Sequence, residues 1–194
     1  MPNLALVLQD TTLRRTAAMI LAYMGPKAKM AVPALIASLR DEDPKTRREI
    51  IFALGSVGPA ASRAVEALAQ SLTDEDMDVR YSAAFALGKI GPAAADAEPA
   101  LVKNLDSPDK FLALVSAWAL VQIAPDSDLT LTKAMPLLID GLTNSAATVR
   151  IEAATALGAL GPKAKPAIAP LQKLLTDPNQ QVQAAAKKAL EAIE

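Results

Sequence analysis

Apolar positions along the chain recur with helical spacing, in segments separated by short polar turns. Over residues 79–90, Ala83, Ala86, Leu87 and Ile90 fall on one arc of a helix, which we expect to pack on the preceding shorter segment. Shorter segments such as 31–39 begin near a proline, which is tolerated in the first turn of a helix. The pattern predicts an all-α protein whose helices come in pairs.

The pairs repeat with a nearly constant period. The steps that end the longer segments lie 33, 33, 33 and 37 residues apart: Gly25-Pro26, Gly58-Pro59, Gly91-Pro92, Ala124-Pro125 and Gly161-Pro162. Leucine also recurs in register, at Leu21, Leu54, Leu87, Leu120, Leu157 and Leu190. Such a period is typical of a solenoid of stacked two-helix units. We predict one solenoid domain, residues 1–194, with units at approximately 1–25, 26–58, 59–91, 92–124, 125–161 and 162–194, from a shortened helix at 2–9 to a last helix at 180–193.

The turns inside the units carry acidic residues. In the turn 74–76, Asp and Glu side chains offer N-cap oxygens to the helix that follows. Gly91-Pro92 then ends that helix, because glycine adopts the left-handed C′ conformation and proline cannot continue a helix. We interpret these carboxylates, and those of Asp126 and Asp128, as caps and solvated groups instead of catalytic acids.

Composition narrows the possible chemistry. The chain has no Cys and no His, which excludes disulfides, thiol nucleophiles, imidazole bases and Cys/His zinc sites. The chain has 20 basic and 21 acidic residues, whereas proteins that neutralise many phosphates carry an excess of basic residues. No apolar run approaches the roughly 18 residues of a membrane span, and Met1-Pro2-Asn3 lacks a basic secretion start. We expect a cytoplasmic, non-catalytic protein with no metal, cofactor, nucleic acid or membrane as a ligand.

Recurring Val-Arg, Ala-Ala, Ala-Leu-Gly and Ile-Gly steps resemble HEAT repeats, in particular the short bacterial HEAT-like class associated with phycobilisome lyases. The resemblance covers the whole chain and implies a right-handed α-α superhelix. It also implies a ladder between an Asp in the turn and an Arg six residues later. Two units keep both members (Asp41/Arg47 and Asp74/Arg80), two keep one (Asn144/Arg150 and Asp177/Gln183), and Ser107/Ala113 has neither.

All six aromatic residues fall on one arc of the longer helices, at 100° per residue. They are Tyr23, Phe52, Tyr81, Phe85, Phe111 and Trp118. We expect this arc to face solvent, and the resemblance places it on the concave side of the superhelix. An exposed aromatic strip of this kind marks a partner site. The alternative is that the rings lie across the seams between units and are covered by neighbouring helices.

The fourth unit departs most from the repeat. Its second helix, 111–124, is apolar nearly all round, which predicts burial on every side. Val121 replaces a small residue that is Gly88 in the third unit, Ala124 replaces the closing glycine, and the following loop gains four residues. We expect either a site or a local bend here.

These observations predict an interaction scaffold that binds a protein segment in a concave groove. The predicted contact residues are Phe52, Tyr81, Phe85, Phe111, Leu114, Trp118 and Ile151, with Arg48 and Lys89 in a surrounding polar frame. One alternative, implied by the resemblance, is a bilin lyase-like subunit that holds a tetrapyrrole. Another is a HEAT-like nucleic-acid-binding protein that uses Arg14, Arg47, Arg80 and Arg150.

The two ends of the solenoid differ. The last helix carries Lys187, Lys188, Glu191 and Glu194, which suit a solvated end, whereas residues 4–8 have no polar face. We therefore expect the N-terminal end to be covered, either by a second copy of the chain or by a domain outside this sequence.

Overall fold

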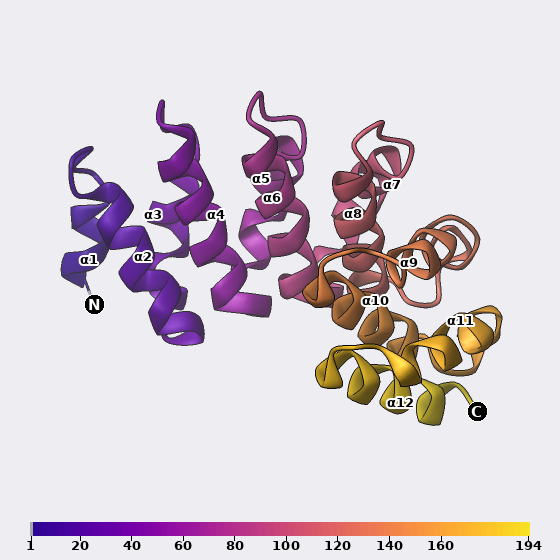
Figure 1. The fold of residues 1–194 in the computed structure, drawn as a ribbon. Coiled ribbons are helices and arrows are strands. Elements are labelled where there is room, and N and C mark those ends of the chain that lie inside the picture. The colour runs from indigo at the N-terminus through magenta and orange to yellow at the C-terminus, as the bar shows by residue number, and fades with distance from the viewer. Residues whose placement is uncertain (1) are drawn as a thin grey trace.

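A computed structural model describes residues 2–194, with side chains from residue 5 onward, and shows six helix pairs in a stack (Figure 1). The first helices are α1 (Pro2–Val7), α3 (Val32–Ala37), α5 (Val65–Ser71), α7 (Glu98–Asn104), α9 (Met135–Gly141) and α11 (Ile168–Lys173). The second helices are α2 (Arg14–Met24), α4 (Pro44–Val57), α6 (Met77–Ile90), α8 (Lys110–Ile123), α10 (Ala147–Ala159) and α12 (Gln180–Ile193). The described residues contain no strand, so the predicted all-α solenoid is confirmed. Each pair is called a unit below, numbered one to six.

The ends of the second helices follow the sequence signals. The side chains of Asp43, Asp76, Asp109 and Asn179 accept backbone N–H groups at the starts of α4, α6, α8 and α12. The helices α2, α4 and α6 end at a glycine with positive φ, at Gly25, Gly58 and Gly91, and Gly161, also with positive φ, follows α10 after one further residue. Seven-residue 3-10 stretches begin at these glycines and join one unit to the next. Two first helices are shorter than predicted, because α3 spans Val32–Ala37 instead of 31–39 and α1 spans Pro2–Val7 instead of 2–9.

Consecutive second helices pack closely because glycine lies where they touch. A Cβ added to Gly55 would lie 3.0 Å from Cα of Ala86, and one added to Gly158 would lie 2.9 Å from Cα of Ala189. Gly88 makes the same approach to Ala119, at 3.1 Å. Ala86 therefore faces the preceding second helix, and the prediction that it packs on its own first helix was wrong. A single layer of buried Ala, Leu, Ile and Val runs through the stack.

The stack bends after unit four. In Figure 1, α2, α4, α6 and α8 stand side by side, whereas α10 and α12 lie across that direction. α8 and α10 touch over a much shorter stretch than the other consecutive second helices do. Val121 stands where glycine allows close approach elsewhere, and a π-helical turn, Thr130–Ala134, replaces the 3-10 stretch. The distortion predicted for this unit is present.

Within residues 2–194, none of the helices combines the length and the apolarity needed to cross a lipid bilayer.

Candidate partner-binding groove

A ladder of ion pairs joins the turns of neighbouring units. Arg47 donates from Nε and Nη2 to the two carboxylate oxygens of Asp74, at 2.9 and 2.7 Å. Arg150 binds Asp177 in the same two-pronged way, at 2.8 and 2.9 Å. Arg14 pairs with Asp41. In each case the carboxylate belongs to the following unit, so the prediction of a carboxylate pairing within a unit was wrong. The predicted pairs Asp41/Arg47 and Asp74/Arg80 are hydrogen-bonded only through the backbone carbonyl of the aspartate.

Within its own unit each arginine binds backbone instead. Nη1 of Arg47 donates to the carbonyl oxygen of Asp41 at 2.8 Å, and Nη1 of Arg150 donates to that of Asn144 at 2.7 Å. The side chain six residues after the turn thus ties its own turn to the next one. Gln183 keeps the backbone bond, to the carbonyl oxygen of Asp177 at 2.7 Å.

The ladder holds its carboxylates in the ionised form. Burial alone would raise the pKa of Asp74, but hydrogen bonds from Arg47 and from the N–H of Asp76 outweigh it and lower that pKa. The hydrogen bond from Arg150 lowers the pKa of Asp177. Aspartates of the following units therefore form ion pairs with Arg14, Arg47 and Arg150. This pairing does not favour a role for these arginines in binding phosphate groups.

Aromatic contacts replace the ladder between units three and four. The turn position that holds Asp41, Asp74 and Asp177 in units two, three and six is Ser107 in unit four, so Arg80 lacks the carboxylate that Arg14, Arg47 and Arg150 bind. Beside this gap, the Tyr81 hydroxyl donates to Oδ2 of Asp109 at 2.8 Å, and its ring meets Phe111 edge-on, with centroids 4.9 Å apart. Burial, followed by the hydrogen bond to Asp109, raises the pKa of the Tyr81 hydroxyl, which keeps it protonated as the donor.

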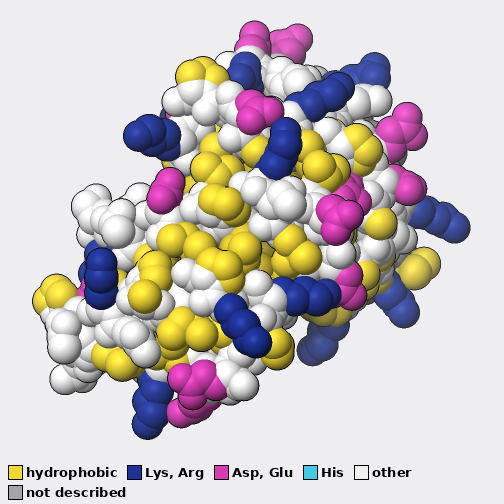
Figure 2. Space-filling view, turned by 90° about the vertical axis from the view of Figure 1, so that its right-hand side faces the viewer, with side chains coloured by type: hydrophobic (Ala, Val, Ile, Leu, Met, Phe, Trp, Pro, Cys, Tyr) yellow, Lys and Arg dark blue, Asp and Glu magenta, His cyan; other side chains and the backbone are white. Residues whose placement is uncertain are grey.

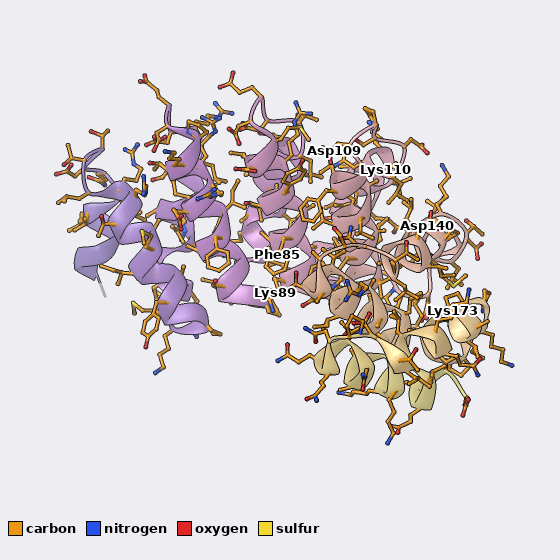
Figure 3. All side chains as sticks on the ribbon, viewed as in Figure 1. Phe85, Lys89, Asp109, Lys110, Asp140 and Lys173 are labelled. Carbon is orange, nitrogen blue, oxygen red and sulfur yellow. The ribbon has the colours of Figure 1, made fainter. Side chains whose placement is uncertain are left out.

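A second ring pair continues the seam between α6 and α8. Phe85 stacks on Trp118 with centroids 5.1 Å apart and an interplanar angle of 13°. The rings still meet solvent, because Phe52 is 50%, Phe85 36% and Phe111 47% exposed. The expected exposure is thus present, while Tyr81 and Trp118 are half-buried in the seam as the alternative proposed. Phe85 and Lys89 lie one turn apart on α6, and both side chains are exposed (Figure 3).

An apolar pocket of about 220 Å³ opens where α10 turns away from α8. Its lining comes from α6, α8, α9 and α10: Phe85, Phe111, Leu114, Val115, Trp118, Leu138, Thr148, Val149, Glu152 and Ala153. The polar members, Thr148 and Glu152, are exposed on the first turns of α10. From the side that carries units four to six, hydrophobic side chains gather across the middle of the surface with most charges around them (Figure 2).

The pocket unites four of the nine predicted contact residues: Phe85, Phe111, Leu114 and Trp118. The other five lie outside its lining: Phe52, Tyr81, Ile151, Arg48 and Lys89. Arg48 is engaged by Asp78 at 3.6 Å and Glu49 at 3.7 Å, whereas Lys89 is exposed. The partner role of all nine stays a prediction.

Six of the ten lining residues were not among the predicted contact residues. Val115 carried a usable signal, because it is apolar where the equivalent residues of the neighbouring units are Ser82 and Glu152. Leu138 and Val149 carried none, since they reach the pocket through the bend between units four and five.

Three buried side-chain atoms without a hydrogen-bond partner lie around this bend. They are Nδ2 of Asn104, Oγ of Ser116 and Oγ1 of Thr130, and within the described side chains no others were found. Unpaired buried polar atoms cost stability. The fourth unit and its connection to the fifth are therefore the least satisfied part of the core.

Stacked helix pairs joined by an inter-unit ladder define an α-solenoid repeat protein. The HEAT repeat model matches residues 2–76, 32–121 and 98–191. The chain belongs to the HEAT repeat family.

The structure also resembles engineered proteins. One crystal structure of an engineered protein is 29% identical, with a TM-score of 0.70, over 98% of this chain and 95% of that one. A second, also titled an engineered protein, is 27% identical, with a TM-score of 0.67, over 98% of this chain and 57% of that one. The search of curated proteins returned no match.

HEAT repeats generally serve as scaffolds without catalysis of their own. Among the described residues, no group of three or more Asp or Glu side chains is placed to hold a metal ion.

Proposed function

We propose that the protein is a non-catalytic scaffold that binds a segment of another protein, with one large apolar side chain of that segment seated in the pocket between α8 and α10. The observation that carries this proposal is the pocket itself, an apolar hollow walled by a stacked Phe85–Trp118 pair. Aromatic anchors inside a polar rim are the usual centre of protein interfaces. Cytoplasmic location remains part of the proposal.

The size of the pocket favours a side chain over a whole cofactor. Pockets for drug-sized molecules measure about 300–1,000 Å³, and this one measures about 220 Å³. A tetrapyrrole is larger than a typical drug and carries two propionates, while the pocket offers it no basic lining residue. The exposed rings of Phe52 and Phe85 extend the apolar surface along α4 and α6, which suits an elongated peptide.

The experiment selects binding segments from a displayed peptide library and measures their affinities by calorimetry. Against the wild type, we expect the selected segments to share one large apolar residue. Val115→Glu, which puts a charge on the pocket wall, should weaken binding by about tenfold or more. Leu175→Ala removes an exposed leucine from the last unit and serves as the matched control.

Circular dichroism shows whether each variant keeps its helices. Segments that bind Val115→Glu as tightly as the wild type, while that variant remains folded, would overturn the proposal. Equal loss in Leu175→Ala would do so as well, since that residue lies outside the pocket lining.

A further inference from the structure

The first unit exposes more large apolar side chains than the rest of the chain does for its length. Eleven are exposed in the described side chains, and six of them lie within the first thirty residues: Leu6, Leu13, Met19, Ile20, Tyr23 and Met30. Contiguous exposed apolar surface on a water-soluble domain marks an interaction site. Four of these side chains belong to α2 and its N-cap.

Those four lie on one side of α2. At 100° per residue, Leu13, Met19, Ile20 and Tyr23 fall within an arc of about 120°, with Thr16 among them. Tyr23 is 95% exposed and Ile20 is 44% exposed. This arc is called the α2 face below. Its positions 13 and 20 are buried in later second helices, as at Val79 and Ala86, whereas the positions of Met19 and Tyr23 are exposed there too, as at Phe85 and Lys89.

The residue at position 20 is incompatible with a further HEAT unit packed on the α2 face. The residues equivalent to Ile20 in units two to six are all alanine and all buried: Ala53, Ala86, Ala119, Ala156 and Ala189. Three of them touch a glycine of the preceding helix so closely that a single added Cβ would lie 2.9–3.1 Å away. An isoleucine has three more carbons than alanine and does not fit that spacing. A preceding HEAT unit, stacked as the others are, would clash with Ile20.

The opposite end of the stack does not match the α2 face. α12 exposes Lys187, Lys188 and Glu191, and charged side chains of this kind do not pack against leucine and isoleucine. Head-to-tail stacking of copies is therefore disfavoured. The surface that matches an apolar α2 face is a second α2 face, as in a twofold dimer.

We infer that two copies of the chain pair through their α2 faces, with the two α2 helices antiparallel. Centred near Ala18, this arrangement sets Leu13 opposite the partner's Tyr23 and Thr16 opposite the partner's Ile20. It also brings Asp10 close to the partner's Lys27, and both of these side chains are exposed. A parallel pairing would instead crowd the lysines of both copies, so charge favours the antiparallel one.

The first test is the mass in solution, by sedimentation equilibrium over a dilution series. The wild type should show a dimer of twice the 20.2 kDa chain that dissociates on dilution. Ile20→Lys should raise the dissociation constant by about a hundredfold, because it puts two charges into the contact. Ile20→Ala, which restores the residue found in every other unit, should weaken it by about tenfold and must fold. Leu175→Lys is the control and should dimerise like the wild type.

The second test uses the absence of native cysteine. Met19→Cys, near the proposed axis, should cross-link to its copy with a short bis-maleimide, whereas Lys188→Cys at the other end should not. A wild type that stays monomeric up to high micromolar concentration would overturn the inference. So would a dimer that survives Ile20→Lys unchanged, or cross-linking that is equal at positions 19 and 188.

Discussion

The junction between α4 and α6 and the junction between α8 and α10 show how this solenoid controls its own curvature. At the first, Gly55 lets the helices touch and Arg47 grips Asp74 of the next unit. At the second, Val121 keeps the helices apart and the ladder position holds Ala113. The first junction is closed, while the second bends and leaves an apolar pocket. The close contact at glycine and the ion pair between units thus keep the stack straight. Where both are absent, the stack bends and the candidate site forms.

Acid should have the largest effect on stability, because protonation of the aspartates removes every ion pair of the ladder at once. The pKa values of Asp74 and Asp177 are lowered in the folded protein. Their contribution to stability is therefore complete above the ordinary aspartate pKa of about 4 and is lost as the pH falls through the lower folded values. We expect the melting temperature to hold from neutral pH to about pH 5 and then to fall steeply towards about pH 2.5. Circular dichroism measures the melting temperature at each pH. A melting temperature that does not fall even at the lowest pH would contradict this role of the ladder.

Removal of one rung should show its local strength. Arg47→Ala leaves the Asp74 carboxylate without its partner in a site where both side chains are less than 15% exposed. We expect it to lower the free energy of unfolding by about 2–3 kcal/mol. Arg80→Ala is the matched control, because its ladder partner position is Ser107, and should cost less than about 1 kcal/mol. Urea unfolding measures both, and equal losses would mean that the ladder does not join the units.

Removal of a buried, unpaired hydroxyl beside the bend should have a smaller effect, and this one should stabilise the protein. Ser116 is fully buried, its Oγ has no partner, and the equivalent residues of units three and five are Ala83 and Ala153. Ser116→Ala should raise the free energy of unfolding by about 1 kcal/mol. Ser38→Ala removes a buried hydroxyl that does have a partner, the carbonyl oxygen of Ala34 at 3.0 Å, and should give no gain. Equal effects in the two variants would show that the missing partner does not matter.

The smallest expected effect comes from rebuilding a rung. Oγ of Ser107 already accepts the N–H of Asp109, as the Asp74 carboxylate accepts that of Asp76. Ser107→Asp should keep this bond, give Arg80 its missing partner and add about 0.5–1 kcal/mol. The gain should disappear in an Arg80→Ala background. A gain that persists in the Arg80→Ala background would show that the added stability comes from the turn and not from the ladder.

Most of the architecture could be predicted because the sequence repeats. The Gly-Pro steps, the leucine columns and the acidic caps predict six helix pairs, and the structure has them. The ladder shows a limit of this reasoning. Asp41 lies six residues before Arg47 and 27 residues after Arg14, and in a 33-residue period both pairings recur equally. Only the fold distinguishes the two, by bringing the Arg14 side chain to Asp41.

The candidate site was predictable in part. Aromatic placement pointed to Phe85 and Trp118, and loss of the repeat pattern pointed to the fourth unit. The direction of the bend could not be read from the sequence, because four inserted residues can turn a chain in many ways. The π-helical turn at Thr130–Ala134 and the α10 wall of the pocket both follow from that direction.

The most direct test of the account uses the fluorescence of Trp118, the single tryptophan of the chain, which lines the pocket. The free protein should be quenched by acrylamide, because Trp118 is half-buried at an open pocket. A saturating amount of a selected peptide should shift the emission to shorter wavelength and reduce quenching severalfold. Binding seen by calorimetry with no change in the emission or quenching of Trp118 would contradict the account, because the segment would then bind elsewhere.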